Sequence, residues 1–178
     1  SGSLIQPLAA PGDVKFQDVN GDGVISANDR INAGNSFPSL TYALNASANY
    51  RGFDLSMLWS GSQGNKIFNG LKYGGTFMQG TTYNNSPAIL DRWTPESPSN
   101  DVPRVTIKDL NNNKAYSTLY IEEGSYVRLK YLTLGYTFGE NLIKNSAVNL
   151  RVFATLQNLL TFTKYSGFDP EIGADLES

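Results

Sequence analysis

The clearest hydrophobic pattern in the sequence lies in residues 40–50, LTYALNASANY, where apolar and polar side chains alternate. Such a period of two is typical of a β-strand with one apolar face. After Arg51-Gly52, residues 53–61 (FDLSMLWSG) repeat the alternation, so the two segments predict a β-hairpin. The apolar face of the first strand is predicted to carry Leu40, Tyr42, Leu44, Ala46, Ala48 and Tyr50.

Two more strands are predicted toward the end of the chain. Residues 125–138, SYVRLKYLTLGYTF, alternate, but their apolar positions change phase around Lys130-Tyr131, which predicts a β-bulge. Residues 148–162, VNLRVFATLQNLLTF, alternate most clearly, with Leu150 and Val152 on the apolar face. The pattern therefore predicts an all-β fold of antiparallel strands.

The connections between these strands differ greatly in length. Residues 62–117 are rich in Gly, Asn, Ser and Pro and show no sustained periodicity, which predicts a long functional loop. The short connections, at 51–52 and 139–146, fall at one end of the predicted sheet. Outer-membrane barrels have short periplasmic turns, long extracellular loops, a lipid-facing apolar side and a polar lumen. This asymmetry favours part of a transmembrane β-barrel with 62–117 outside the cell, although the alternation alone fits a soluble β-sandwich equally well.

The aromatic residues follow the same division. The chain has 10 Tyr and 9 Phe among 178 residues, a composition that suits β-strands. Tyr50 and Phe53 flank the short turn, whereas Trp59 and Tyr126 lie toward the other end. Two interfacial girdles of a membrane barrel would place aromatic residues at these two levels.

Charge and missing residue types narrow the function. With 14 basic and 16 acidic residues and no basic run, no nucleic-acid surface is indicated. The chain has neither His nor Cys, which removes the commonest general base and every thiolate site. Acidic pairs at Asp91 with Glu96, or Glu122 with Glu123, are hydrolase candidates that nothing orients. We therefore predict no enzymatic activity. Residues 1–178 are treated as a single region, in which residues 1–3, SGS, are typical of a cloning remnant.

Residues 18–29, DVNGDGVISAND, fit the pattern of an EF-hand calcium loop. Alternate oxygen ligands would converge on one ion, and Gly23 would permit the sharp turn at position six. The predicted ligands are Asp18, Asn20, Asp22, the carbonyl of Val24, Ser26 and Asp29. An Asp in place of the usual Glu at position twelve predicts weaker closure. The isolated loop resembles those of dockerins, and its calcium would be structural. The alternative is an Asx-rich turn whose side chains bond their own backbone without metal.

Several separate segments, taken together, resemble one family. They are GDVKFQDVNGDGVISANDR, YRGFDLSMLWSGSQGNKIFN, DRWTPESPSNDVPR, YIEEGSYVRLKYLTLGYTF and NLRVFATLQNLLTFTKYSGFDPE. In this order they are similar to the C-terminal barrel region of SusC/RagA-type TonB-dependent transporters of Bacteroidetes. The stretch NAGNSFPSLTY departs mildly from the Asn-Pro-rich version of that family.

The resemblance implies an outer-membrane importer of oligosaccharides or peptides. It implies a lipid bilayer around the barrel, energy from the TonB complex, and a SusD-like surface lipoprotein as partner. It also implies that the plug and the TonB-contacting segment belong to parts of the transporter outside this chain. Four strands cannot close a barrel, so we expect the isolated chain to self-associate or to adopt a non-native β-structure. The competing hypothesis is a secreted, calcium-stabilised carbohydrate-binding β-sandwich.

Overall fold

The protein is described here by a computed structural model that covers residues 4–76, 84–139 and 149–171. The chain groups into two compact units. The sheet unit comprises residues 35–67 and 123–171, and the loop unit comprises residues 4–34 and 68–122 within the described ranges. In chain order the elements are η1 (Ala27–Asp29), β1 (Leu40–Tyr50), β2 (Phe53–Gln63), β3 (Lys66–Phe68), α1 (Gly70–Gly75), η2 (Pro87–Asp91), η3 (Thr118–Tyr120), β4 (Ile121–Glu123), β5 (Tyr126–Thr137) and β6 (Arg151–Thr163).

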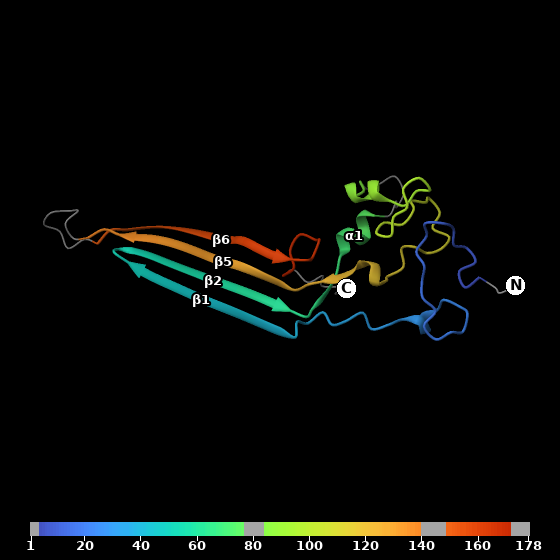
Figure 1. The fold of residues 1–178 in the computed structure, drawn as a ribbon, viewed down its shortest axis with the longest axis horizontal. Coiled ribbons are helices and arrows are strands. Elements are labelled where there is room, and N and C mark those ends of the chain that lie inside the picture. The colour runs from blue at the N-terminus through green and yellow to red at the C-terminus, as the bar shows by residue number, and fades with distance from the viewer. Residues whose placement is uncertain (1–3, 77–83, 140–148, 172–178) are drawn as a thin grey trace. The chain divides into compact units, whose positions relative to one another are not determined.

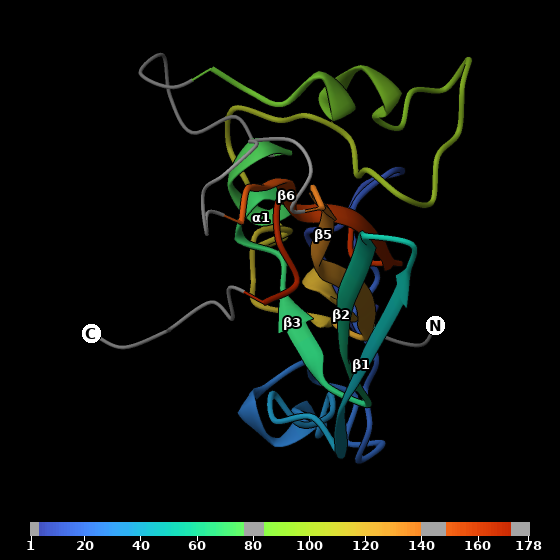
Figure 2. The same cartoon turned by 90° about the vertical axis from the view of Figure 1, so that its left-hand side faces the viewer.

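The sheet unit contains a four-stranded antiparallel sheet in the order β1-β2-β5-β6 (Figure 1). Figure 2 shows the same strands after a 90° turn, with β1 at one edge and β6 at the other. The first predicted strand matches β1, and β2 continues two residues beyond the predicted segment, to Gln63. The prediction of antiparallel strands is confirmed. Val148, at the start of the last predicted strand, lies outside the described residues.

The strand register places most apolar residues of the four strands on one face. Residues directly opposite each other in neighbouring strands point to the same side of a sheet. From the short turn outward, the rows are Tyr50-Phe53-Tyr136-Val152, Ala48-Leu55-Leu134-Ala154, Ala46-Met57-Leu132-Leu156, Leu44-Trp59-Leu129-Leu160 and Tyr42-Gly61-Val127-Phe162. Leu44 and Phe162 are 62% and 60% exposed and Leu129, at the centre of the sheet, is 5% exposed, so among the described residues much of this apolar face is uncovered.

The opposite face of the sheet is largely polar. Its rows are Asn49-Asp54-Gly135-Phe153, Ser47-Ser56-Thr133-Thr155, Asn45-Leu58-Tyr131-Gln157, Ala43-Ser60-Arg128-Thr161 and Thr41-Ser62-Tyr126-Thr163. Arg151 reaches across Gly135 to form an ion pair with Asp54, and a side chain at Gly135 would collide with both partners. Thr133 and Thr155 share a hydrogen bond of 2.9 Å between their hydroxyls.

The predicted bulge is present at Lys130. Leu129 pairs with Trp59 and Tyr131 with Leu58, which leaves Lys130 as an extra residue on β5. The bulge shifts the phase of β5, so that its apolar residues stay on one face on both sides of the irregularity. On β6 the register also shifts here, and Asn158 has a φ of 50°. The two-residue turn between β1 and β2 has positive φ at both Arg51 and Gly52, as in a type I′ hairpin turn.

The aromatic girdle prediction is partly wrong. Tyr50, Phe53 and Trp59 lie in apolar rows as expected, and the rings of Phe53 and Tyr136 lie 4.5 Å apart. Tyr126, in contrast, lies in a polar row, and its hydroxyl donates to Glu171 at 2.7 Å. The error arose because the bulge at Lys130 reverses which positions of β5 face the apolar side.

The loop unit has more local structure than the predicted loop suggested. It contains the short helices α1, η2 and η3, and its core includes the fully buried Tyr120 and Asn113. The strands β3 and β4 form a separate two-stranded sheet. Within the described ranges, no helix has the length and apolar character needed to cross a membrane.

Candidate functional site

The calcium-type loop, residues 18–29, is folded by hydrogen bonds from its own backbone. The Asp18 carboxylate accepts from the N–H groups of Gly21 and Gly23, at 2.7 and 2.8 Å. Asp22 accepts from the Val24 N–H at 2.9 Å, and Asn20 accepts from the Asp22 N–H at 3.0 Å. Gly23 has a φ of 81°, which agrees with the predicted sharp turn.

Asp29 closes the loop through backbone contacts. Its carboxylate accepts from Val19 N–H at 2.9 Å and from Ser26 N–H at 2.6 Å, while the Ser26 hydroxyl caps η1. The hydrogen bonds from the backbone of Ser26 and Val19 hold the pKa of Asp29 below its usual value. Its charged form is therefore favoured at neutral pH.

These contacts are those of the Asx-rich turn, and they also leave carboxylate lone pairs free for a cation. The six predicted ligands are all oxygen donors, the donor type that calcium prefers. Within the described residues, no three acidic, His or Cys side chains converge as a metal-binding group. Calcium binding at this loop therefore stays a prediction.

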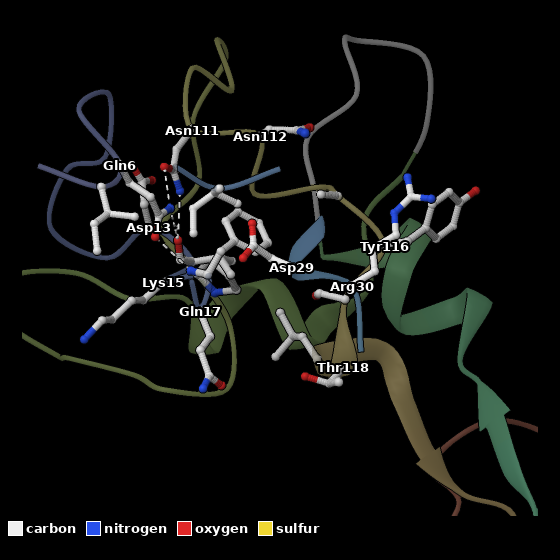
Figure 3. Close-up of a pocket in the computed structure, with 18 of the residues that line it drawn as sticks. Gln6, Asp13, Lys15, Gln17, Asp29, Arg30, Asn111, Asn112, Tyr116 and Thr118 are labelled. Atoms are coloured by element: carbon white, nitrogen blue, oxygen red, sulfur yellow. Dashed lines mark hydrogen bonds between the residues drawn. The ribbon is translucent and has the colours of Figure 1, made fainter. Parts of the chain in front are cut away.

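A cavity of about 1630 Å³ lies within the loop unit, lined by parts of residues 5–33 and of 68–121 (Figure 3). Gln6, Asp13 and Asn111 lie together at one side of it (Figure 3). The Asp13 side chain is 1% exposed and pairs with Arg104 in two contacts. Burial by itself raises the pKa of Asp13, but hydrogen bonds from Arg104, Asn113 and the Ala10 N–H more than offset it, so the pKa lies below its usual value.

Side-chain amides replace a strand partner beside this cavity. The Val14 N–H donates to Asn113 Oδ1 at 2.9 Å, and the Val14 carbonyl accepts from Gln6 and Asn111 at 3.1 and 2.9 Å. Phe16 N–H donates to Gln6 Oε1 at 2.8 Å. The sequence analysis missed these residues, and the only available signal was the consecutive run of Asn at 111–113.

The loop aromatics pack against their own unit. The rings of Tyr73 and Tyr116 are stacked 5.1 Å apart, and Tyr73 also meets Tyr120 edge to face at 5.2 Å. Trp93 covers Gly12, where a Cβ would lie 2.4 Å from the indole ring. The position of Tyr83 lies outside the described residues.

The candidate carboxylate pairs have separate partners. Glu123 accepts from Lys66 at 2.8 Å and from the Ser125 hydroxyl at 2.6 Å, and Glu122 accepts from Asn69 at 3.1 Å. Neighbouring residues of β4 point to opposite sides of the strand, so Glu122 and Glu123 do not share one substrate position. Asp91 is the last residue of η2, and Glu96 lies in an exposed loop.

Comparison with known proteins shows which proteins this chain is similar to. The chain is 35% identical over 162 residues to TonB-dependent receptor P3 of Formosa agariphila, a match that covers 90% of this chain and 16% of that protein. The TonB-dependent receptor SusC of Bacteroides thetaiotaomicron is 26% identical over 167 residues, 92% of this chain and 16% of SusC. The chain is homologous to SusC/RagA-type TonB-dependent receptors. No protein-family model matches it.

The solved structures agree with the sequence relatives. The RagAB peptide transporter superposes with a TM-score of 0.71 at 29% identity, covering 87% of this chain and 18% of that one. The RagAB peptide importer in its open-open state gives 0.70 at 29% identity, with 89% and 18% coverage. The partial coverage fits a C-terminal barrel segment, and the four-stranded sheet is not closed.

Three predictions are settled by this homology. The family resemblance and the β-barrel type of fold are confirmed. SusC/RagA-type receptors are outer-membrane proteins, so the predicted location is confirmed. The relatives are receptors and transporters rather than enzymes. The chain spans only 16% of the length of the curated relatives that it matches.

Proposed function

We propose that this chain forms part of the wall of a TonB-dependent outer-membrane importer. Strands β1, β2, β5 and β6 would face lipid with their apolar rows and the import passage with their polar rows. The observation that carries this proposal is the register, which places most apolar side chains on one face and most polar ones on the other, with Leu58 and Phe153 as exceptions. The strands have 11, 11, 12 and 13 residues, at or slightly above the upper end of the roughly 9–11 that a tilted strand needs to cross a bilayer.

The soluble β-sandwich has less support. A sandwich requires its apolar face to be buried against a second sheet. Leu150 and Val152 are 43% and 58% exposed, and the edge strands β1 and β6 are exposed along nearly their whole length. A lipid-facing surface accounts for this exposure without a second sheet.

The cargo of the importer is proposed to be an oligosaccharide or a peptide, taken up with a SusD-like surface lipoprotein. Support comes from the likeness to SusC and to the RagAB peptide transporter. Coupling to the TonB complex would occur through parts of the transporter outside this chain.

The calcium loop is proposed to bind one structural calcium ion through its oxygen donors. In an extracellular site, binding at about 10⁻⁴ to 10⁻³ M suffices for occupancy. Calcium should then slow backbone exchange across residues 18–29, and Asp22→Ala should abolish that slowing. If calcium changes the exchange rates of neither the unmodified chain nor the Asp22→Ala variant, the loop is an Asx-rich turn that binds no metal.

Fluorescence quenching by a brominated detergent tests the orientation of the sheet. The chain has two tryptophans, Trp59 on the apolar face and Trp93 in the loop unit. In the Trp93→Phe variant, emission from Trp59 should be strongly quenched when brominated dodecyl maltoside replaces the ordinary detergent. Bromine quenches over short range, so only a tryptophan in contact with acyl chains responds.

The matched control is Trp59→Phe, which leaves Trp93 as the sole emitter. We expect little quenching of Trp93, because it packs on Gly12 within the loop unit. Equal, weak quenching of both variants would contradict the assignment of Trp59 to a lipid-facing surface. It would favour the soluble β-sandwich instead.

A further inference from the structure

The segment after β6, residues 164–171, folds back onto the polar face of β5. Asp169 accepts two hydrogen bonds from Arg128, at 2.7 and 3.2 Å, and Glu171 accepts one at 2.9 Å. Arg128 lies in a polar row between Ser60 and Thr161. The segment therefore covers the end of the polar face that is remote from the short turn.

Arg128 is the centre of this contact. Its side chain is only 6% exposed, and its Nε donates to the Thr161 hydroxyl at 2.9 Å. All three guanidinium nitrogens thus have partners, and the pair with Asp169 has the two-pronged geometry that makes Arg–carboxylate contacts strong. A buried guanidinium that lost these carboxylates would keep an uncompensated charge. The position of Asp169 and Glu171 against β5 is therefore fixed by Arg128.

Two further side chains of β5 hold Glu171. Lys130, the extra residue of the bulge, donates to Glu171 at 2.5 Å, and the Tyr126 hydroxyl donates at 2.7 Å. Because a bulge re-aims side chains, it provides the position from which Lys130 reaches this carboxylate. Asp169 also accepts from the Glu171 N–H at 2.9 Å, and Pro170 between them is buried.

The part of the segment before Asp169 makes contacts of a different kind. The Tyr165 N–H donates to the Thr163 hydroxyl at 3.1 Å, and Gly167 lies against the Tyr165 ring, where an added Cβ would come within 2.3 Å of it. Phe168, next to Asp169, is 90% exposed. The charged contacts with β5 are thus concentrated in residues 169–171.

We propose that residues 164–171 form a carboxylate latch, which closes over the polar face of β5 and opens when Asp169 and Glu171 release Arg128. Its functional meaning rests on the proposed importer, in which that face lines the passage. A closed latch narrows the passage at the end where the long connections lie, and an open latch exposes Arg128, Lys130 and Tyr126 to cargo.

Hydrogen–deuterium exchange of the full chain in detergent micelles tests the latch. In the double variant Asp169→Asn with Glu171→Gln, amides of residues 164–171 should exchange about tenfold or more faster, since the charge-assisted bonds are lost. Amides at the centres of β5 and β6 should keep their protection. The control is Asp91→Asn with Glu96→Gln, which removes the same two charges from the loop unit and should leave 164–171 unchanged.

Two results would overturn the latch. Unchanged exchange of 164–171 in the double variant would mean that other contacts hold the segment. Loss of protection throughout β5 and β6 would mean that the segment is an integral part of the sheet. Arg128→Lys keeps the charge without the two-pronged geometry and should give an intermediate acceleration. Quenching of Trp59 by brominated detergent is independent of these outcomes, so failure of the latch and failure of the importer proposal are distinguishable.

Discussion

The sheet unit and the loop unit are built from different kinds of hydrogen bond. In the sheet unit, backbone groups pair with backbone groups along β1, β2, β5 and β6. In the loop unit, backbone groups of residues 14–16 pair with the side chains of Gln6, Asn111 and Asn113. A strand ladder tolerates changes of side chain, whereas a backbone held by side-chain amides depends on each of them.

The two units also differ in which side chains they bury. The apolar rows of the sheet remain largely exposed, while the loop unit buries polar residues such as Asn113 at 0% exposure and Asn69 at 1%. Buried polar groups are costly unless they are hydrogen-bonded. Substitutions of buried amides should therefore weaken the loop unit more than most substitutions weaken the sheet.

The largest effect is expected for Asn113→Ala. This change removes the acceptor for Val14 N–H and Asn111, at 2.9 and 2.8 Å, and the donor to Asp13 at 2.8 Å. Leaving such buried groups unpaired costs roughly 3 kcal/mol in the free energy of unfolding of the loop unit. Hydrogen exchange should show faster opening of residues 4–34 and 84–122 with little change in β5 and β6.

The matched substitution is Asn100→Ala, at an exposed position of the same unit. It should leave exchange within the loop unit nearly unchanged. Equal effects of the two alanine substitutions would remove the distinction between buried amides and ordinary loop asparagines.

A smaller effect is expected for Gly61→Ala in β2. The new Cβ would lie 2.5 Å from the Tyr42 ring and 2.7 Å from the Tyr126 carbonyl oxygen. The ring can move but the backbone of β5 cannot easily do so, so the sheet should lose about 2 kcal/mol of stability. Exchange should accelerate around residues 59–63 and 126–129, whereas Gly139→Ala, which meets no atom within 4 Å, should not accelerate it.

The smallest effect is expected from acidification around Asp13. Because the pKa of Asp13 is lowered in the folded state, its contribution to stability is complete above its ordinary value of 3.8 and is lost as the pH falls through the lowered pKa. Arg104 and Asn113 face this carboxylate, and Asp109 acts on Arg104. In the Trp59→Phe variant, emission from Trp93 should change below pH 4 and stay constant between pH 5 and 8.

The comparison for this last measurement is Asp13→Asn in the same background. It removes the titrating group, so the transition below pH 4 should disappear. A transition that persists would assign the acid response to another carboxylate.

The sequence predicted the part of the structure held by backbone pairing in the sheet better than the part held by side-chain amides in the loop unit. The alternation predicted the four strands within a few residues at their described ends, and the phase change predicted the bulge at Lys130. The homology confirmed the family that the ordered segments suggested. Regular alternation is visible because each residue pairs locally along a repeating ladder.

The amide contacts and the latch were not predicted, for a shared reason. Asn113 meets Val14 and Asp169 meets Arg128 across long stretches of sequence, and neither contact has a period. Tyr126 was assigned to the wrong face of β5. The change of phase in the sequence shows that a bulge is present, but it does not show on which side of the bulge the alternate residues change face. The oxygen ligands proposed at residues 18–29 stay a prediction, since Asx turns and calcium loops use the same residue types.

The connection between β2 and β5 has a consequence for the order in which the chain folds. The β1–β2 hairpin closes around two residues, but β2 can pair with β5 only after residues 64–125 have been looped out. Loop closure costs entropy, although each doubling of length adds only about 0.6 kcal/mol. Because β3 pairs with β4, early formation of that small sheet would bring the two ends of the 64–125 connection close together. The pairing of β3 with β4 would then shorten the loop that the pairing of β2 with β5 has to close.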